Sequence, residues 1–295
     1  MKICIAALAL CSLSGFVLAD ELEDSYTKLK DAVAKKDPDA VMESAAATSK
    51  LAKAAENAPK PTDADEAKNW QQRVDYAKEV DGYTEYALSF TAAQPGVDPA
   101  KVVALVDALI AQNPKSKYID DLCANAYLVA LKPGGAAKQL AGMTKIIAGR
   151  PDNTVALQAL VEGGQTKYAE KLIAAMKAKA KPEGFSEADW EKQKNNAFAT
   201  GYFNLGYVAL QKQIWVDCDK NFRAVVPLLA GDQGRLGTAY FGLGVCDFSL
   251  GKMTNDRTKM QAGEQYSEKA AAIKGPMQDQ AYKNVAVMKQ ALGGR

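Results

Sequence analysis

The chain has 295 residues, 48% of them apolar, and 37 Lys and Arg residues stand against 35 Asp and Glu residues. A net charge of +2 with the two signs intermixed argues against nucleic-acid binding, which needs a basic stripe to neutralise phosphates. The chain has no histidine, so any acid–base chemistry would rest on carboxylates, Lys or Tyr.

Residues 1–19 have the layout of a secretory signal: a charged start, an apolar run and the small residues of Val17-Leu18-Ala19. Cleavage before Asp20 would release an exported protein, periplasmic or secreted, with no stable membrane insertion. Two alternatives are an uncleaved anchor and a lipoprotein acylated at Cys11. No second apolar run of this kind follows.

The next segments predict helices. Residues 20–36 and 38–57 read as a helical hairpin joined at Asp37-Pro38, where Asp can cap the second helix and Pro can occupy its first turn. Residues 58–62, Ala-Pro-Lys-Pro-Thr, form a linker. A long helix is expected over 63–93, with an apolar stripe of Trp70, Val74, Ala77, Tyr83, Tyr86 and Phe90.

Helices alternate with short loops over the rest of the chain, and no segment alternates as a strand would. We expect helices at 99–112, 118–132, 136–148, 154–162 and 166–180, and a long one beginning at Ser186. Antiparallel helix pairs stacked in order favour an all-α solenoid.

This pattern divides the chain into four parts. After the signal, 1–19, come an N-terminal helical hairpin, 20–58, and a degenerate helical-repeat region, 63–182. Residues 186–295 contain the clearest repeats and a C-terminal capping helix.

Cysteine usage changes once the signal is removed, because only Cys123, Cys218 and Cys246 remain. A disulfide between Cys218 and Cys246 is possible in an exported protein, since they lie on consecutive predicted helices. The alternative is three buried thiols that act as small apolar residues. With no CxxC pair and no histidine, no metal site is expected.

Two copies of an aromatic-x-x-Leu-Gly motif indicate an internal repeat. Tyr202-Phe203-Asn204-Leu205-Gly206 is followed 38 residues later by Tyr240-Phe241-Gly242-Leu243-Gly244. Each copy precedes a small residue with an aromatic four positions further on: Cys218 with Phe222, and Ala262 with Tyr266.

On these motifs, residues 199–275 resemble tetratricopeptide repeats. The resemblance implies a right-handed superhelix of helix pairs in which the motif glycine permits close helix approach. Pro276 lies close to the family's closing proline. Two departures are Asp247, at a position usually aromatic or small, and about six extra residues around 254–261, which we expect to lengthen the turn.

Members of this family bind peptides or extended partners in the concave groove lined by the first helix of each repeat. The positions that the resemblance assigns to this groove are Phe203, Tyr207, Gln211, Phe241, Val245 and Ser249. Such a groove would be apolar and aromatic, and the Lys and Asn of the chaperone-tail clamp are replaced by Phe203 and Tyr207. Aromatic residues at helical spacing also serve packing between helices.

Enzyme motifs are incomplete. Ser25-Tyr26-Thr27-Lys28 matches Ser-x-x-Lys without the remaining motifs of penicillin-recognising enzymes, and Gly251-Lys252 lacks the Ser or Thr of a phosphate loop. The sequence therefore predicts a non-enzymatic protein-interaction scaffold of the cell envelope, without a cofactor, that binds a protein or peptide. The alternative is a small-ligand or glycan-binding helical domain with tyrosine walls near Trp70 and Trp190.

Overall fold

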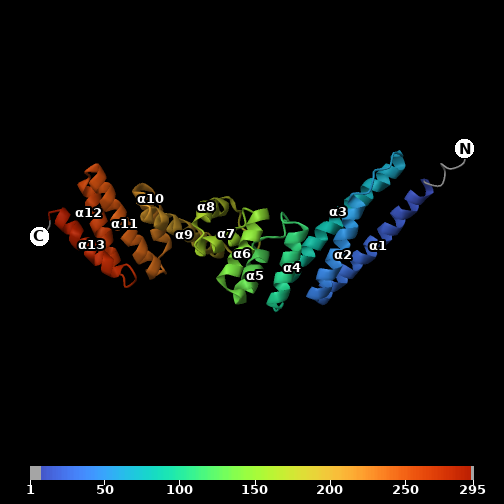
Figure 1. The fold of residues 1–295 in the computed structure, drawn as a ribbon, viewed down its shortest axis with the longest axis horizontal. Coiled ribbons are helices and arrows are strands. Elements are labelled where there is room, and N and C mark those ends of the chain that lie inside the picture. The colour runs from blue at the N-terminus through green and yellow to red at the C-terminus, as the bar shows by residue number, and fades with distance from the viewer. Residues whose placement is uncertain (1–7, 294–295) are drawn as a thin grey trace. The chain divides into compact units, whose positions relative to one another are not determined.

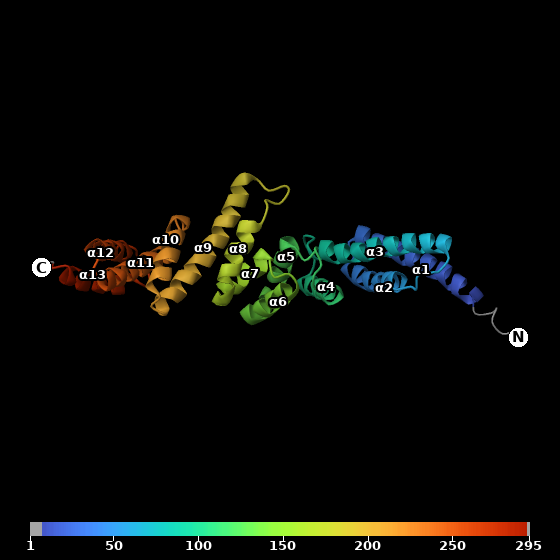
Figure 2. The same ribbon diagram turned by 90° about the horizontal axis from the view of Figure 1, so that it is seen from above.

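The computed structural model of the chain describes residues 8–293, and within that range it is all-helical without a strand. The chain divides into two compact units, Met1–Ala156 and Leu157–Arg295. Within each unit, most helices pack against the next one along the chain, and several also contact the helix after that (Figures 1 and 2). The all-α prediction is confirmed.

The first unit contains α1 (Leu8–Lys35), α2 (Pro38–Glu56), α3 (Ala64–Ala92), α4 (Pro99–Gln112), α5 (Asp121–Leu131) and α6 (Gly135–Gly149). The predicted hairpin at Asp37-Pro38 is present, and the Asp37 carboxylate accepts hydrogen bonds from the backbone N–H groups of Asp39 at 3.1 Å and Ala40 at 3.2 Å. Asp63 and Asp98 cap α3 and α4 in the same way.

The predicted signal segment coincides with the start of α1. Residues 1–7 lie outside the described residues, and residues 8–19 belong to a helix that continues to Lys35. The predicted cleavage point before Asp20 therefore lies within this helix. Among the residues that the structure describes, no helix combines enough length and apolarity to cross a bilayer.

The start of α5 differs from its predicted start at 118. Residues 116–119 form turns, in which the Tyr118 N–H bonds to Ser116 Oγ at 3.2 Å, and the helix begins at Asp121. Asp120 caps it by accepting from the Cys123 N–H at 2.9 Å. A competing local turn thus delays the helix by three residues.

The apolar residues of α3 form two stripes where the sequence analysis expected one. Val74 and Ala77 are buried, and Ala77 packs in a core with Leu22 of α1 and Ala52 of α2. Tyr86 and Phe90 lie outside this core and remain 36% and 38% exposed. These two aromatic rings of α3 therefore lie at the surface of the unit, while its core takes the smaller apolar residues of the helix.

The second unit takes in most of α7 (Thr154–Glu162), followed by α8 (Ala169–Ala178), α9 (Glu187–Gln211), α10 (Trp215–Val225), α11 (Gln233–Thr254), α12 (Arg257–Ala271) and α13 (Gln278–Ala291). The side chains of Cys218, Phe222, Val225, Leu243 and Cys246 are buried together between α10 and α11. Phe222 is the largest side chain in this cluster and is fully buried.

Both motif glycines lie where helices approach closely. A Cβ at Gly206 would come within 2.9 Å of the Phe222 ring, and one at Gly244 within 2.2 Å of Ser267 Oγ. Ordinary contacts of a Cβ are much longer, so only glycine permits this spacing. The expected role of these two glycines in close helix approach therefore agrees with the geometry.

The turn between α11 and α12 is shorter than the sequence analysis expected. The extra residues around 254–261 extend the helices: α11 continues to Thr254 and α12 already begins at Arg257. Asn255 takes the left-handed conformation, with φ of 54°, and Asp256 caps α12. The expectation of a lengthened turn was wrong.

The close contact of α12 with α11 also uses other residues than expected. The motif predicted Ala262 and Tyr266, but a Cβ at Gly263 would lie 2.6 Å from the Phe248 backbone nitrogen, and Ser267 is the residue facing Gly244. Tyr266 is half-buried beside Tyr240, with ring centroids 6.0 Å apart. The contact is shifted by one residue along α12 relative to the motif.

Candidate functional site

The first half of the predicted groove lies on α9 as a pair of packed rings. Phe203 and Tyr207 stack with an interplanar angle of 8° and centroids 6.4 Å apart. Phe203 also meets the edge of Phe222 at 6.1 Å, and both residues pack against the buried cluster of the second unit. Gln211 is exposed at the end of the helix. The two aromatic rings are therefore half-buried packing residues.

The second half of the predicted groove lies on α11. Phe241 packs against the buried alanines Ala270, Ala271 and Ala281 of α12 and α13. Val245 and Ser249 are half-buried. Phe241 thus lies in a different cluster from Phe203 and Tyr207.

A hollow of about 440 Å³ lies between α8 and α10, on a side of α9 that does not include Phe203 and Tyr207. None of the six predicted groove residues lines it. Its apolar part comes from two helices and the loop before α10: Ile173 and Ala174 of α8, then Tyr202, Leu205, Val208 and Ala209 of α9, then Ile214 of the loop. Ile214 is 45% exposed, so the apolar lining reaches the solvent.

Charged side chains surround this apolar part. Lys177, Lys212 and Lys220 contribute three cations, and Glu170 and Asp217 contribute two carboxylates. These five residues have no ion-pair partner within the described part of the chain. The hollow therefore offers an apolar surface bordered by side chains free to form ion pairs.

The sequence gives little sign of this hollow because α8 supplies one wall. The aromatic-x-x-Leu-Gly motif begins only at Tyr202, and the basic run from Lys171 to Lys181 suggests a solvated helix face. Gly201 brings α8 close to α9, since a Cβ there would lie 2.6 Å from Ile173. A glycine one residue before the motif was the only sign of this contact in the sequence.

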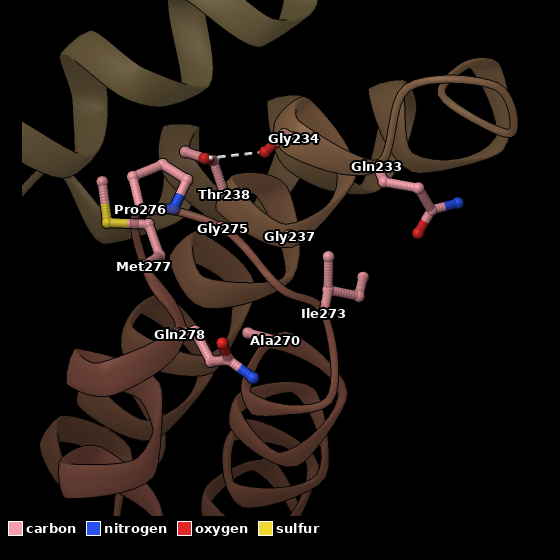
Figure 3. Close-up of a pocket in the computed structure, with 10 residues that line it drawn as sticks. All are labelled: Gln233, Gly234, Gly237, Thr238, Ala270, Ile273, Gly275, Pro276, Met277 and Gln278. Atoms are coloured by element: carbon pink, nitrogen blue, oxygen red, sulfur yellow. Dashed lines mark hydrogen bonds between the residues drawn. The ribbon is translucent and has the colours of Figure 1, made fainter.

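A second depression, between the start of α11 and the loop that joins α12 to α13, has no room for a water molecule (Figure 3). Thr238 Oγ1 donates to the Gly234 carbonyl at 3.0 Å, and Gln278 Nε2 donates to the Ala271 carbonyl at 3.0 Å. The expected closing proline, Pro276, lines this depression. It is a packing seam between helices.

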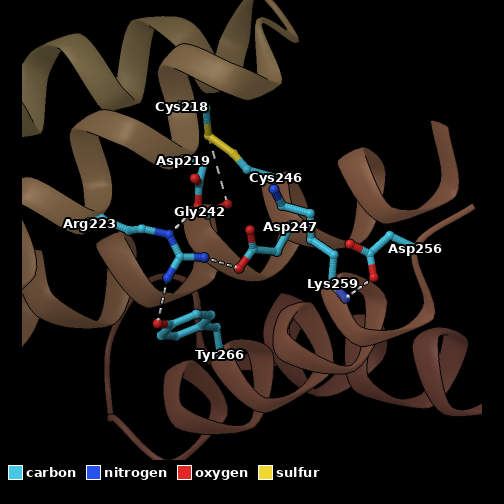
Figure 4. Close-up of polar contacts among 9 residues, drawn as sticks. All are labelled: Cys218, Asp219, Arg223, Gly242, Cys246, Asp247, Asp256, Lys259 and Tyr266. Atoms are coloured by element: carbon cyan, nitrogen blue, oxygen red, sulfur yellow. Dashed lines mark hydrogen bonds and ion pairs between the residues drawn. A yellow bond between two sulfur atoms is a disulfide. The ribbon is translucent and has the colours of Figure 1, made fainter. Parts of the chain in front are cut away.

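A disulfide joins Cys218 of α10 to Cys246 of α11, whose Cα atoms are 6.2 Å apart (Figure 4). The sequence analysis considered a disulfide between these two cysteines, with buried free thiols as the alternative. Cys123 of the first unit is a buried free thiol. Burial is the main cause that raises its pKa, to about 12.

Arg223 makes a second link between α10 and α11. Its guanidinium donates to Asp219 at 2.6 Å, to Asp247 at 2.5 Å and to the Tyr266 hydroxyl at 3.0 Å (Figure 4). Asp247 is completely buried, and its Oδ1 has no hydrogen-bond partner among the described residues. The unusual acidic residue noted in the motif is thus the buried end of an ion-pair network.

The two tryptophans of the alternative hypothesis contact loops. Trp70 Nε1 donates to the Ala58 carbonyl at 2.9 Å and so holds the proline linker against α3. Trp190 is buried beside Phe185. Neither residue lines the hollow.

A cluster of aromatic rings lies on the first unit instead. Tyr26 of α1 contacts Tyr83, and Tyr86 contacts Tyr83, Phe90 and Tyr118, with centroids between 5.2 and 5.7 Å apart. Tyr76 completes the cluster at 6.4 Å from Tyr26, and it is 37% exposed. This surface aromatic cluster carries five phenol hydroxyls.

Within the described residues, no group of three or more Cys, Asp and Glu side chains is arranged to hold a metal ion. Comparison of the chain with protein-family models, with curated proteins and with solved structures finds no match.

Proposed function

We propose that the chain is a non-enzymatic scaffold of the cell envelope that binds an extended segment of a partner protein in the hollow between α8, α9 and α10. The observation that carries this proposal is the apolar floor of that hollow within a charged border. Its position differs from the groove that the tetratricopeptide resemblance implies. The interaction role is the same.

The chemistry of the lining favours a peptide with an apolar side chain next to an acidic one. Leu205 and Val208 offer contacts to an apolar anchor, and interface energy concentrates in a few such anchors. Three unpaired lysines against two carboxylates leave an excess of positive charge. Rim charges of this kind raise the association rate and select the partner more than they add affinity.

Replacing Val208 by arginine is expected to weaken partner binding at least tenfold, because the cation would occupy the apolar floor. The measurement is lysine crosslinking of the exported protein in its native envelope, followed by mass spectrometry of the attached peptides. Crosslinks from Lys177, Lys212 and Lys220 to one partner should disappear in the variant.

Val216→Arg is the matched control, because Val216 lies on α10, is 66% exposed and does not line the hollow. It should leave the crosslinks intact. Equal crosslinking in wild type and Val208→Arg would exclude the hollow as the binding site.

The surface aromatic cluster of the first unit supports a second candidate function, glycan binding. Tyrosine rings present apolar faces against which sugar rings can pack, and their hydroxyls can bond to sugar hydroxyls. Tyr76, Tyr86 and Phe90 are each more than a third exposed.

If this cluster binds glycans, Tyr86→Ala combined with Phe90→Ala should abolish retardation of the protein in native gels that contain envelope polysaccharide. Tyr282→Ala is the control, since Tyr282 is 56% exposed and lies on α13. Wild-type protein that migrates equally with and without polysaccharide would eliminate this candidate.

A further inference from the structure

Two carboxylates share a single guanidinium between α10 and α11. Arg223 Nε bonds to Asp219 and Arg223 Nη2 bonds to Asp247 (Figure 4). With both carboxylates ionised, the cluster carries a net negative charge. The Asp247 side chain is 0% exposed, so that charge is partly out of water. A buried charge without full compensation is unfavourable.

The residues around this cluster supply little further positive charge to compensate the two carboxylates. From α12, the Tyr266 hydroxyl accepts from Arg223 and faces the cluster with a neutral group. Lys269 lies over the Tyr266 ring, 5.1 Å from its centroid, and Lys259 and Asp256 lie at the start of α12 (Figure 4). None of these cations forms an ion pair with Asp247, whose Oδ1 stays without a hydrogen bond among the described residues.

We propose that Asp247 binds a proton on its unpartnered Oδ1 under mildly acidic conditions, so that α10 holds α11 more tightly there than at neutral pH. This proton would remove the negative charge of the buried acid. It would leave one negative charge opposite Arg223, so the cluster would become neutral.

The raised pKa of Asp247 supports this proposal. Burial is the main cause that raises the pKa of Asp247, to about 6, and the neighbouring Asp219 raises it further, while Arg223 acts in the opposite direction. An ordinary ion pair would instead lower the pKa of the acid.

The sign of the effect on stability follows from linkage. Between about pH 4 and 6, the folded state binds a proton that the unfolded chain, with an ordinary aspartate, does not bind. Stability therefore rises as the pH falls through this window. It falls as the pH rises, and the loss is complete above the folded pKa.

This carboxyl pair gives the chain a means of responding to mild acid without histidine, which it lacks. Because the pair lies beside the Cys218–Cys246 disulfide, covalent and proton-dependent links both join α10 to α11. Since α10 also contributes Asp217, Lys220 and Asn221 to the hollow, tighter docking of α10 would make one wall of the hollow more rigid.

The test uses the full chain and two measurements. Carboxyl-carbon NMR should show Asp247 titrating near pH 6. Hydrogen exchange of α10 and α11, corrected for intrinsic rates, should show protection about tenfold higher at pH 5 than at pH 7. Asp247→Asn should remove this increase. The control Asp279→Asn, an exposed aspartate on α13, should retain it.

Two results would overturn the proposal. One is a wild-type chain in which Asp247 titrates below about pH 4.5 and protection falls on acidification, as for a simple ion pair. The other is an unchanged pH dependence in Asp247→Asn. Asp219→Asn provides a further check: it removes the like charge, so the pKa of Asp247 should fall and the increase in protection should shrink.

Discussion

Replacing Gly263 by alanine is expected to lower the free energy of unfolding of the second unit by about 2 to 3 kcal/mol. The added Cβ would lie 2.6 Å from the backbone nitrogen of Phe248 and 2.8 Å from the carbonyl oxygen of Gly244. Neither atom belongs to a flexible side chain, so α12 must move away from α11. The gain in helix propensity, about 1 kcal/mol, is too small to compensate.

Hydrogen exchange of α11 and α12 measures this loss in the intact protein. Gly234→Ala is the matched control, because a Cβ there meets only a side-chain oxygen, Asp232 Oδ1, at 3.6 Å. It should leave protection unchanged or raise it slightly. If Gly263→Ala were as well protected as Gly234→Ala, the close approach of α11 and α12 would be wrong.

Removing the disulfide should cost the second unit about 3 to 4 kcal/mol, because the bond closes a loop between residues 28 apart in sequence. We expect Cys218→Ala combined with Cys246→Ala to unfold at a clearly lower urea concentration than oxidised wild type. Both sulfurs are buried in the cluster around Phe222, so lost packing adds to the effect.

Treatment with a reductant separates the contribution of the disulfide to stability from the contribution of side-chain packing. Reduced wild type should lose most of this stability, whereas the double variant should not respond to reductant. Titration of thiols in the unfolded, non-reduced chain of residues 20–295, which lacks Cys4 and Cys11, should find one, Cys123; three would show that the bond does not form.

The sequence predicted helix boundaries well where a cap and a proline coincide. Asp98-Pro99 and Asn113-Pro114 define the ends of α4, which agree with the structure. Prediction failed where tertiary contacts or competing turns determine the residue at which a helix begins or ends. About six extra residues around 254–261 were expected to lengthen a turn, yet α11 continues to Thr254 and α12 begins at Arg257.

The candidate site was harder to predict than the fold. Phe203 and Tyr207 have the spacing of groove residues, and that spacing does not show that they pack on each other and on Phe222. The hollow needs α8, which lies outside the recognisable repeats, and the partner of Asp247 lies 24 residues away on α10. Helical periodicity describes one helix at a time, whereas both features arise between helices.

Among residues 20–293, the cysteines give the molecule one chemical reporter in each unit. Cys123 is buried in the first unit with its thiol strongly disfavoured from ionising, so a thiol reagent in solution can label it only when that unit opens. The Cys218–Cys246 bond is enclosed in the second unit, so its reduction reports the opening of that unit. Labelling and reduction rates on one sample would therefore time the opening of the two halves separately.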